Sequence, residues 1–283
     1  EINTPEILDR GLWEKSGHWE KFGEHMYTST TPDEKIFAIK PMNCPGCVQV
    51  FNQGLKSYRD LPLKMSEFGK VHRYEPSGAL HGLMRVRNFV QDDAHIFCTE
   101  AQIQSEVSNF IDLVFEVYKS FGFDSISIKL STRPDKRVGS DEIWDKSEKA
   151  LSDSLSAKNL DWELLPGEGA FYGPKIDIQF RTALGREESM STIQLDFAAK
   201  ERFGLSFMDE TGNENGEVFV IHRAPLSTHE RFVAFLLEEW AGNLPTWISP
   251  IQAQIITISE KHKEYAQEVR GALELAGVRV RVD

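Results

Sequence analysis

The chain has 283 residues, 40% of them hydrophobic and 11% aromatic, an ordinary composition for a globular protein with a large core. Its 44 acidic and 32 basic residues give a net charge of −12, which gives no support to a broad nucleic-acid surface, so any RNA contact is expected to be local. No apolar run approaches the roughly 18 residues of a membrane span, and Glu1, Glu6 and Asp9 stand where a signal peptide carries positive charge, so a soluble, cytoplasmic protein is expected.

Both ends of the chain predict a fragment of a longer protein. Residues 1–8 hold a short extended pattern and a proline with no capping signal, and residues 278–283 stop in the middle of an alternating strand.

The first motif along the chain is a C-x-x-C pair, Cys44 and Cys47, in which Pro45 leads into a helical pattern over residues 48–58. Together with Cys98, these thiols are too few and odd in number for a disulfide framework. We therefore expect reduced thiols or metal ligands.

Residues 68–95 predict two strands that carry an unusual set of polar side chains. Alternate residues of an extended chain share a face, which groups Arg73 with Glu75. The same spacing groups Gln91, Asp93 and His95. Polar side chains on the inner face of a sheet indicate a bound ligand.

The segment between these strands, residues 76–84, holds Gly78 and Gly82 and predicts a mobile hairpin loop, with Arg85 and Arg87 at its exit. Arginine forks suit phosphate oxygens. A solvated, salt-bridged hairpin is the alternative, but the charges are interleaved with apolar residues, which argues against simple exposure.

The remaining elements follow from periodicity and turn signals. A helix is predicted from Thr99 to Phe121, with Thr99 and Gln102 in capping-box spacing, and a second amphipathic helix near residues 141–155. Strands are predicted over 125–130, 175–180, 192–197 and 217–222, with a hairpin turn at 183–185, and a helix over 228–241.

Hairpins dominate this pattern, so the expected fold class is α+β, a mainly antiparallel sheet flanked by helices, over residues 1–244. The composition turns to linker over 245–250. A strand over 251–259, a helix over 260–276 and a strand over 278–282 then predict the start of a separate α/β domain, residues 245–283.

Cys44, His95 and His222 are the metal candidates. One cysteine and two histidines suit zinc, and three protein ligands leave a fourth position free, as in catalytic sites. A lone histidine on a strand is more often a hydrogen-bonded residue, and spacing alone does not assemble these three. Cys44 and Cys47 also allow a thiol–disulfide site or half of a zinc ribbon, although neither the redox fold nor a second cysteine pair is visible.

The chain resembles the catalytic core of bacterial threonyl-tRNA synthetases, a class II aminoacyl-tRNA synthetase family, in an ordered series of long motifs: residues 42–98 from MNCPGC to HIFC, then KLSTRPDKRVGSDEIW, GEGAFYGPKIDI, STIQLDF, IHRAPLSTHERF and LPTWISPIQ. The resemblance implies ATP-dependent activation of L-threonine and its transfer to tRNA(Thr) by a homodimer. It also implies that residues 245–283 begin an anticodon-binding domain, and that an editing region and a dimer-forming helix lie outside this chain.

Residue by residue, the resemblance assigns Cys44, His95 and His222 to a zinc ion. Zinc can take both the amino and hydroxyl groups of threonine, whereas the nearly isosteric valine lacks the second ligand. The resemblance further implies that Asp93 holds the amino group, and it lines the pocket with Gln91, Tyr172 and Gln194.

For ATP, which Mg²⁺ normally accompanies, the resemblance assigns Arg73 to the α-phosphate, Glu75 to the adenine amino group, Arg85 to the γ-phosphate and Arg231 to the adenine ring. His18 matches a histidine near the terminal ribose of tRNA, where it could help proton transfer; the alternative is a surface histidine beside Trp19.

Three positions depart from the family pattern. Cys47 replaces a histidine and, if turned inward, could occupy the fourth zinc position; Ser189 replaces a glutamine near the ATP ribose; Ser227 replaces a glycine before Arg231. The competing hypotheses are a catalytically lapsed relative that binds tRNA-like RNA and a thiol–disulfide protein.

Overall fold

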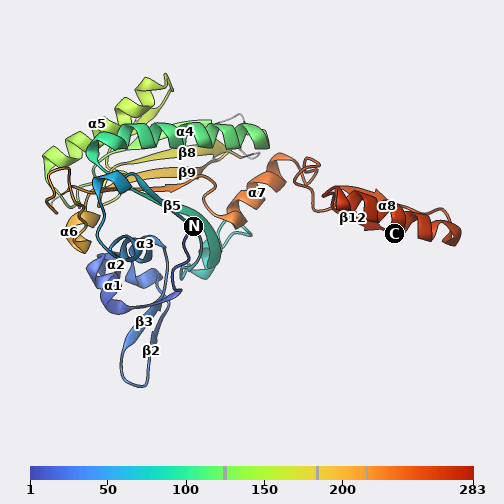
Figure 1. Ribbon diagram of the computed structural model, residues 1–283, viewed down its shortest axis with the longest axis horizontal. Coiled ribbons are helices and arrows are strands. Elements are labelled where there is room, and N and C mark those ends of the chain that lie inside the picture. Colours follow the sequence, from blue (N-terminus) through green and yellow to red (C-terminus); the bar gives the residue numbers. More distant parts are fainter. Residues whose placement is uncertain (124–125, 183–184, 215) are drawn as a thin grey trace. The chain divides into compact units, whose positions relative to one another are not determined.

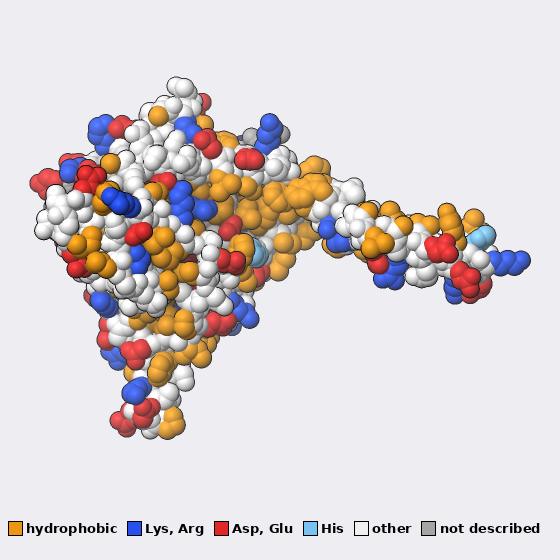
Figure 2. Space-filling model, in the orientation of Figure 1, with side chains coloured by type: hydrophobic (Ala, Val, Ile, Leu, Met, Phe, Trp, Pro, Cys, Tyr) orange, Lys and Arg blue, Asp and Glu red, His pale blue; other side chains and the backbone are white. Residues whose placement is uncertain are grey.

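The computed structural model describes residues 1–123, 126–182, 185–214 and 216–283, and the chain divides into two compact units, residues 1–234 and 235–283. Among the described residues, no helix combines the length and apolar character needed to cross a lipid bilayer. On the face drawn in Figure 2, basic and acidic side chains are interspersed.

A large sheet forms the centre of the first unit (Figure 1). Within the described residues it has seven strands, in the order β4 (Leu63–His72), β5 (Asn88–Cys98), β10 (Phe219–Ala224), β9 (Glu187–Asp196), β8 (Lys175–Arg181), β6 (Ile126–Ser131) and β7 (Glu163–Leu165). Every neighbouring pair is antiparallel except β6 and β7. The predicted fold class, a mainly antiparallel sheet flanked by helices, is confirmed.

Two long helices, α4 (Glu100–Phe121) and α5 (Asp141–Ala157), lie along one face of this sheet (Figure 1). The predicted capping box forms, because Thr99 and Gln102 satisfy each other's backbone N–H groups, and Gly122 ends α4 in the left-handed conformation. The apolar stripe of α4 is buried, including Val107, Ile111 and Val114.

The opposite face of the sheet packs against α3 (Cys44–Phe51), where Phe51 stacks on Phe97 with ring centroids 4.3 Å apart. The other elements of this part are α1 (Arg10–Lys15), α2 (His18–Phe22), α6 (Ala199–Phe203) and a small sheet in the order β1 (Ile7–Asp9), β3 (Ile36–Ile39), β2 (Thr28–Thr30). Three-residue 3₁₀ turns lie at Gly23–His25, Tyr58–Asp60 and Ser77–Ala79.

The second unit contains a parallel pair of strands, β11 (Ala253–Ile255) and β12 (Val280–Val282), connected through a 3₁₀ turn (Glu260–His262) and α8 (Lys263–Leu275). Helix α7 (His229–Glu239) spans the division between the units. A strand, a helix and a parallel strand are the pattern predicted for this region.

Several predicted boundaries are wrong. Helix α3 ends at Phe51 instead of continuing to residue 58, because the chain turns at Gly54 with φ +76°. Strand β9 begins at Glu187, five residues before the predicted start at 192, because pairing with β8 holds its polar first half in the sheet. The strand predicted over 251–259 is limited to Ala253–Ile255, because β12 has only three residues with which it can pair.

Two predictions fall partly outside the described residues: the first residue of the strand predicted over 125–130, and the turn at 183–185, of which only Gly185 is described. Strand β4 ends at His72, so Arg73 and Glu75 lie just beyond it, although the Arg73 N–H still donates to the Arg87 carbonyl at 2.9 Å.

Candidate active site and metal centre

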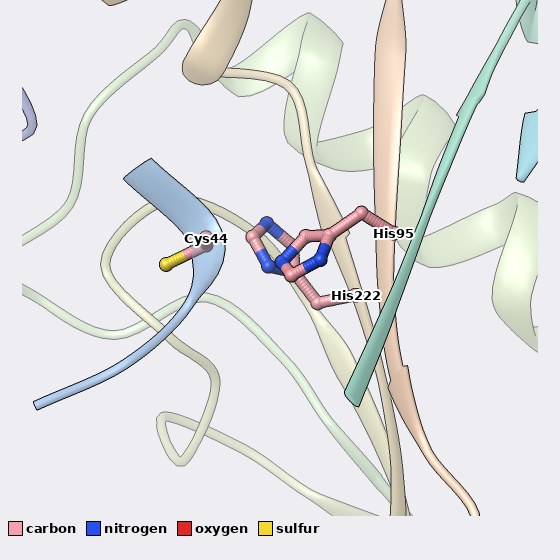
Figure 3. Close-up of side chains that lie close together, drawn as sticks. All are labelled: Cys44, His95 and His222. Carbon is pink, nitrogen blue, oxygen red and sulfur yellow. The ribbon is translucent and has the colours of Figure 1, made fainter. Parts of the chain in front are cut away.

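The three metal candidates come together from three elements of the first unit. Cys44 begins α3, His95 lies on β5 and His222 on β10, and one ligand atom from each lies within 4.8 Å of the other two (Figure 3). His95 and His222 pair directly across the two strands, with ring centroids 4.6 Å apart. Strand register therefore brings two imidazoles to one point of the sheet, and α3 adds the thiol.

The chemistry of this donor set fits a borderline-soft divalent cation such as zinc. His95 Nε2 is buried and has no hydrogen-bond partner among the described residues, although a buried polar atom of this kind needs one. Burial lowers the pKa of His95, which favours the neutral imidazole that binds metals. Burial, with Asp93 nearby, raises the pKa of the Cys44 thiol, so a thiolate here needs a cation beside it.

Cys47 lies elsewhere. Its side chain is 1% exposed within an apolar cluster that includes Val48 and Phe51, and its Sγ lies 3.9 Å from Met65 Sδ. Desolvation raises the pKa of both Cys44 and Cys47, whereas a redox-active thiol requires a lowered pKa and access to solvent. These observations disfavour both a fourth zinc ligand at Cys47 and a thiol–disulfide site.

Cys44, His95 and His222 line a cavity of about 250 Å³, far more than the roughly 10–15 Å³ that a single water molecule needs. Its walls contain nine of the residues singled out from the sequence: His18, Cys44, Arg73, Gln91, Asp93, His95, Tyr172, Gln194 and His222.

Polar groups converge on this cavity. Asp93 is buried and accepts a hydrogen bond of 3.1 Å from Asn43 Nδ2, and the Tyr172 hydroxyl donates to Gln194 Oε1. Gln91 Oε1 is buried without a partner among the described residues. Burial raises the pKa of Asp93, so an ammonium group beside it would favour its ionised form.

A second cavity, of about 300 Å³, shares Arg73 and Gln91 with the first. Its walls also contain Glu75, Arg85, Ser227 and Arg231. Arg85 and Glu75 form an ion pair, with Arg85 Nη2 3.0 Å from Glu75 Oε2, and Arg231 Nε donates to the Met84 carbonyl at 3.1 Å. Three guanidinium groups in one cavity suit a polyphosphate.

Arg73 stands between the two cavities. Its Nε donates to the Pro41 carbonyl at 3.0 Å, and its guanidinium lies 5.2 Å from the centre of the Phe89 ring. These contacts fix the side chain at the place where ligands in the two cavities would meet.

His18, at the start of α2, is half-buried and contacts Trp13 and Phe171 edge-on, with Nδ1 2.8 Å from Ser16 Oγ. Desolvation by burial, followed by the nearby His222, lowers the pKa of His18 to about 4. The alternative of a surface histidine packed beside Trp19 does not describe this environment, since the ring faces the first cavity.

Two residues that sequence reasoning missed contact this site. Asn43 orients Asp93, and Asp196 Oδ2 lies 3.2 Å from His222 Nε2. Both have a visible signal: Asn43 precedes Cys44, and Asp196 follows Gln194 by two residues on the same strand, so the two side chains share a face. Of the departures, Ser189 accepts a 3.5 Å hydrogen bond from Gln179 Nε2.

Comparisons with known proteins agree with this architecture. The family model described as tRNA synthetase class II core domain (G, H, P, S and T) matches residues 27–240. The threonine–tRNA ligases of Prochlorococcus marinus (strain MIT 9211) and Pelagibacter ubique (strain HTCC1062) are each 59% identical over the whole chain, which covers 44% of either relative. The chain thus spans less than half the length of these curated relatives.

Among solved structures, the one described as the RNA binding domain of threonyl-tRNA synthetase from Cryptosporidium parvum Iowa II has a TM-score of 0.95 and 45% identity, with 100% of this chain and 70% of that chain covered. The fold and the family model together define a class II aminoacyl-tRNA synthetase core. Within that class, the chain belongs to the threonyl-tRNA synthetase family.

Proposed function

We propose that the protein containing this chain is a threonine–tRNA ligase, which activates L-threonine with ATP and transfers it to the 3′ end of tRNA(Thr). The observation that carries this proposal is the cluster of Cys44, His95 and His222 in a cavity that shares Arg73 with a second, arginine-rich cavity. An amino-acid site and a nucleotide site with one arginine between them are what adenylate formation requires.

Cys44, His95 and His222 would hold zinc. When bound, a zinc ion with three protein ligands supplies open coordination for the amino and hydroxyl groups of threonine. Valine cannot supply the hydroxyl, so a site built around that group rejects valine far better than an apolar pocket would. Asp93 would accept a hydrogen bond from the amino group, and Gln91, Tyr172 and Gln194 would line the pocket around the side chain.

Activation is an in-line attack of the threonine carboxylate on the α-phosphate of ATP, with pyrophosphate as the leaving group. Arg73 would contact the α-phosphate, where negative charge develops between the two substrates. Arg85 would bind the γ-phosphate, Glu75 the adenine amino group, and Arg231 the face of the adenine ring. Mg²⁺ would accompany the phosphates.

In the transfer step, His18 would lie near the terminal ribose of tRNA. Its pKa, lowered to about 4, leaves the imidazole neutral at physiological pH, so that one ring nitrogen can accept a hydrogen bond there. Because transfer also depends on RNA contacts, residues 245–283 are proposed to begin an anticodon-binding domain, joined to a catalytic domain over residues 1–244. Homodimer formation and a cytoplasmic location complete the proposal.

Threonine-dependent exchange of pyrophosphate into ATP by the zinc-loaded, full-length protein tests this function. We expect exchange with threonine and, because serine keeps the hydroxyl, with serine as well. Valine should support far less. The Arg231→Ala variant should raise the KM for ATP while the bound zinc is unchanged.

Absence of threonine-dependent exchange in a zinc-loaded, folded sample would refute the proposal. If the same sample bound tRNA, the lapsed relative that acts only as an RNA-binding protein would be favoured instead. A metal-free protein with a reversible disulfide between Cys44 and Cys47 would favour the thiol–disulfide hypothesis.

A further inference from the structure

The carboxylate of Asp196 has a separate partner for each oxygen. Oδ1 accepts hydrogen bonds from the backbone N–H groups of Ala198 at 2.8 Å and Ala199 at 2.9 Å, and Oδ2 lies 3.2 Å from Nε2 of His222. Asp196 is 9% exposed. The carboxylate is therefore held by the start of α6 in an orientation that does not depend on the histidine.

Strand pairing directs Asp196 toward His222. On β9, Gln194 pairs with His222 and Asp196 pairs with Val220, so Asp196 is the diagonal neighbour of the histidine on the same face of the sheet. The His222 ring also contacts His95 at a centroid distance of 4.6 Å and Tyr172 at 5.7 Å. His95 and Tyr172 restrict the rotation of the His222 imidazole, and in the resulting orientation Nε2 faces the carboxylate of Asp196.

We propose that Asp196 is a positioning residue for the metal: it accepts the Nε2–H hydrogen bond of His222 and so leaves Nδ1 as the nitrogen that coordinates zinc. This inference rests on the proposed metal site. A metal-binding histidine commonly donates its other ring N–H to a carboxylate, which fixes the tautomer and raises the basicity of the ligand nitrogen. Asp196 itself contributes no ligand, since the clustered ligand atoms are those of Cys44, His95 and His222.

The Asp196→Asn variant separates this role from the structural one. The amide oxygen can still accept from the N–H groups of Ala198 and Ala199, whereas the amide nitrogen would face His222 Nε2 and donate to it. Donation to Nε2 favours the tautomer that carries its proton on Nδ1. A protonated Nδ1 has no lone pair with which to bind a metal. We expect the zinc affinity, measured by competition with a chromophoric chelator, to fall roughly 10- to 100-fold.

Asp177→Asn is the matched control. Asp177 is a buried aspartate on the neighbouring strand β8, and its carboxylate pairs with Lys175 Nζ at 2.9 Å. The control should keep the parental zinc affinity. Far-UV circular dichroism should show that Asp196→Asn is folded. At saturating Co²⁺, the absorption spectrum of the Co²⁺-substituted variant should differ from that of the Co²⁺-substituted parent, because the metal environment is altered.

A second measurement needs no variant. In the zinc-loaded parent, ¹⁵N spectra of the histidines should show a protonated Nε2 and a metal-bound Nδ1 for His222. A metal-bound Nε2, or equal zinc affinity in Asp196→Asn and parent, would overturn the role of Asp196 and leave the proposed function standing. A parent protein that binds no zinc would overturn both.

Discussion

Gly69 and Asn43 approach each other so closely that a Cβ atom on Gly69 would lie 2.0 Å from Asn43 Oδ1. Gly69 pairs with Gln91 on the sheet, and Asn43 immediately precedes Cys44. This contact lets the start of α3 lie directly on the sheet, where Asn43 donates to Asp93. Because Gly69 has no side chain, α3 can hold Cys44 in the metal cluster, and Asn43 can hold the carboxylate of Asp93, which is proposed to bind threonine.

The Gly69→Ala variant should therefore impair threonine binding. Asn43 is 1% exposed and cannot move aside freely, so we expect overpacking to cost about 1–3 kcal/mol of stability. Loss of the hydrogen bond to Asp93 should raise the KM for threonine roughly tenfold. Gly271→Ala on α8, where a Cβ meets nothing within 4 Å, is the control and should be neutral or stabilising. Unchanged threonine kinetics in Gly69→Ala would contradict the role given to Asn43.

The two cysteines of the C-x-x-C pair should behave differently. Cys44→Ala should lose zinc and threonine-dependent pyrophosphate exchange together, since it removes one of three clustered ligands. Cys47→Ala should keep both, with a loss of about 1 kcal/mol from the small cavity left beside Met65. Metal analysis by mass spectrometry, urea unfolding and the exchange assay distinguish the variants. Zinc loss in Cys47→Ala would show that Cys47 is a ligand after all.

Ser227 has φ +61°, a left-handed conformation that serine adopts at a cost. Ser227→Gly should therefore raise the free energy of unfolding by about 1 kcal/mol. Ser227→Ala keeps the Cβ atom and should give no such gain. The midpoint of urea unfolding at an unchanged slope measures the difference, and equal midpoints for the two variants would show that the backbone at Ser227 is not strained.

A buried ion pair fixes the strand that carries Gly69. Lys40 Nζ lies 2.7 Å from Glu67 Oε1, with the two side chains 1% and 4% exposed, and Thr4 bonds to both. Glu67→Gln keeps the size of the side chain but leaves the ammonium of Lys40 without a counter-charge. We expect a loss of about 3 kcal/mol in the free energy of unfolding.

The exposed pair of Lys35 and Asp33 offers the control, because Asp33→Asn removes a charge that water already solvates. That variant should unfold at nearly the same urea concentration as the parent. Combining Glu67→Gln with Lys40→Met should recover part of the loss, because no unpaired charge is then buried. A Glu67→Gln protein as stable as the parent would contradict the stabilising role given to this ion pair.

Local sequence determined most of the secondary structure in this protein. Three features depend only on residues close together in the sequence, so each could be predicted from spacing alone: the capping box of Thr99 and Gln102, the apolar stripe of α4 and the alternation in β8. Predicted strand boundaries were wrong where a partner strand decides them. Strand β9 extends to Glu187 because β8 pairs with it, and β11 is short because β12 is short.

The candidate metal centre was visible in the sequence only as three separate residues. Cys44, His95 and His222 are too far apart along the chain for any spacing rule, and the resemblance to a family was needed to group them. Strand register then determines what spacing could not: β5 and β10 pair so that His95 faces His222, and α3 lies across them. The contact of Asp196 with His222 and the orientation of Cys47 toward Met65 likewise depend on packing between distant segments.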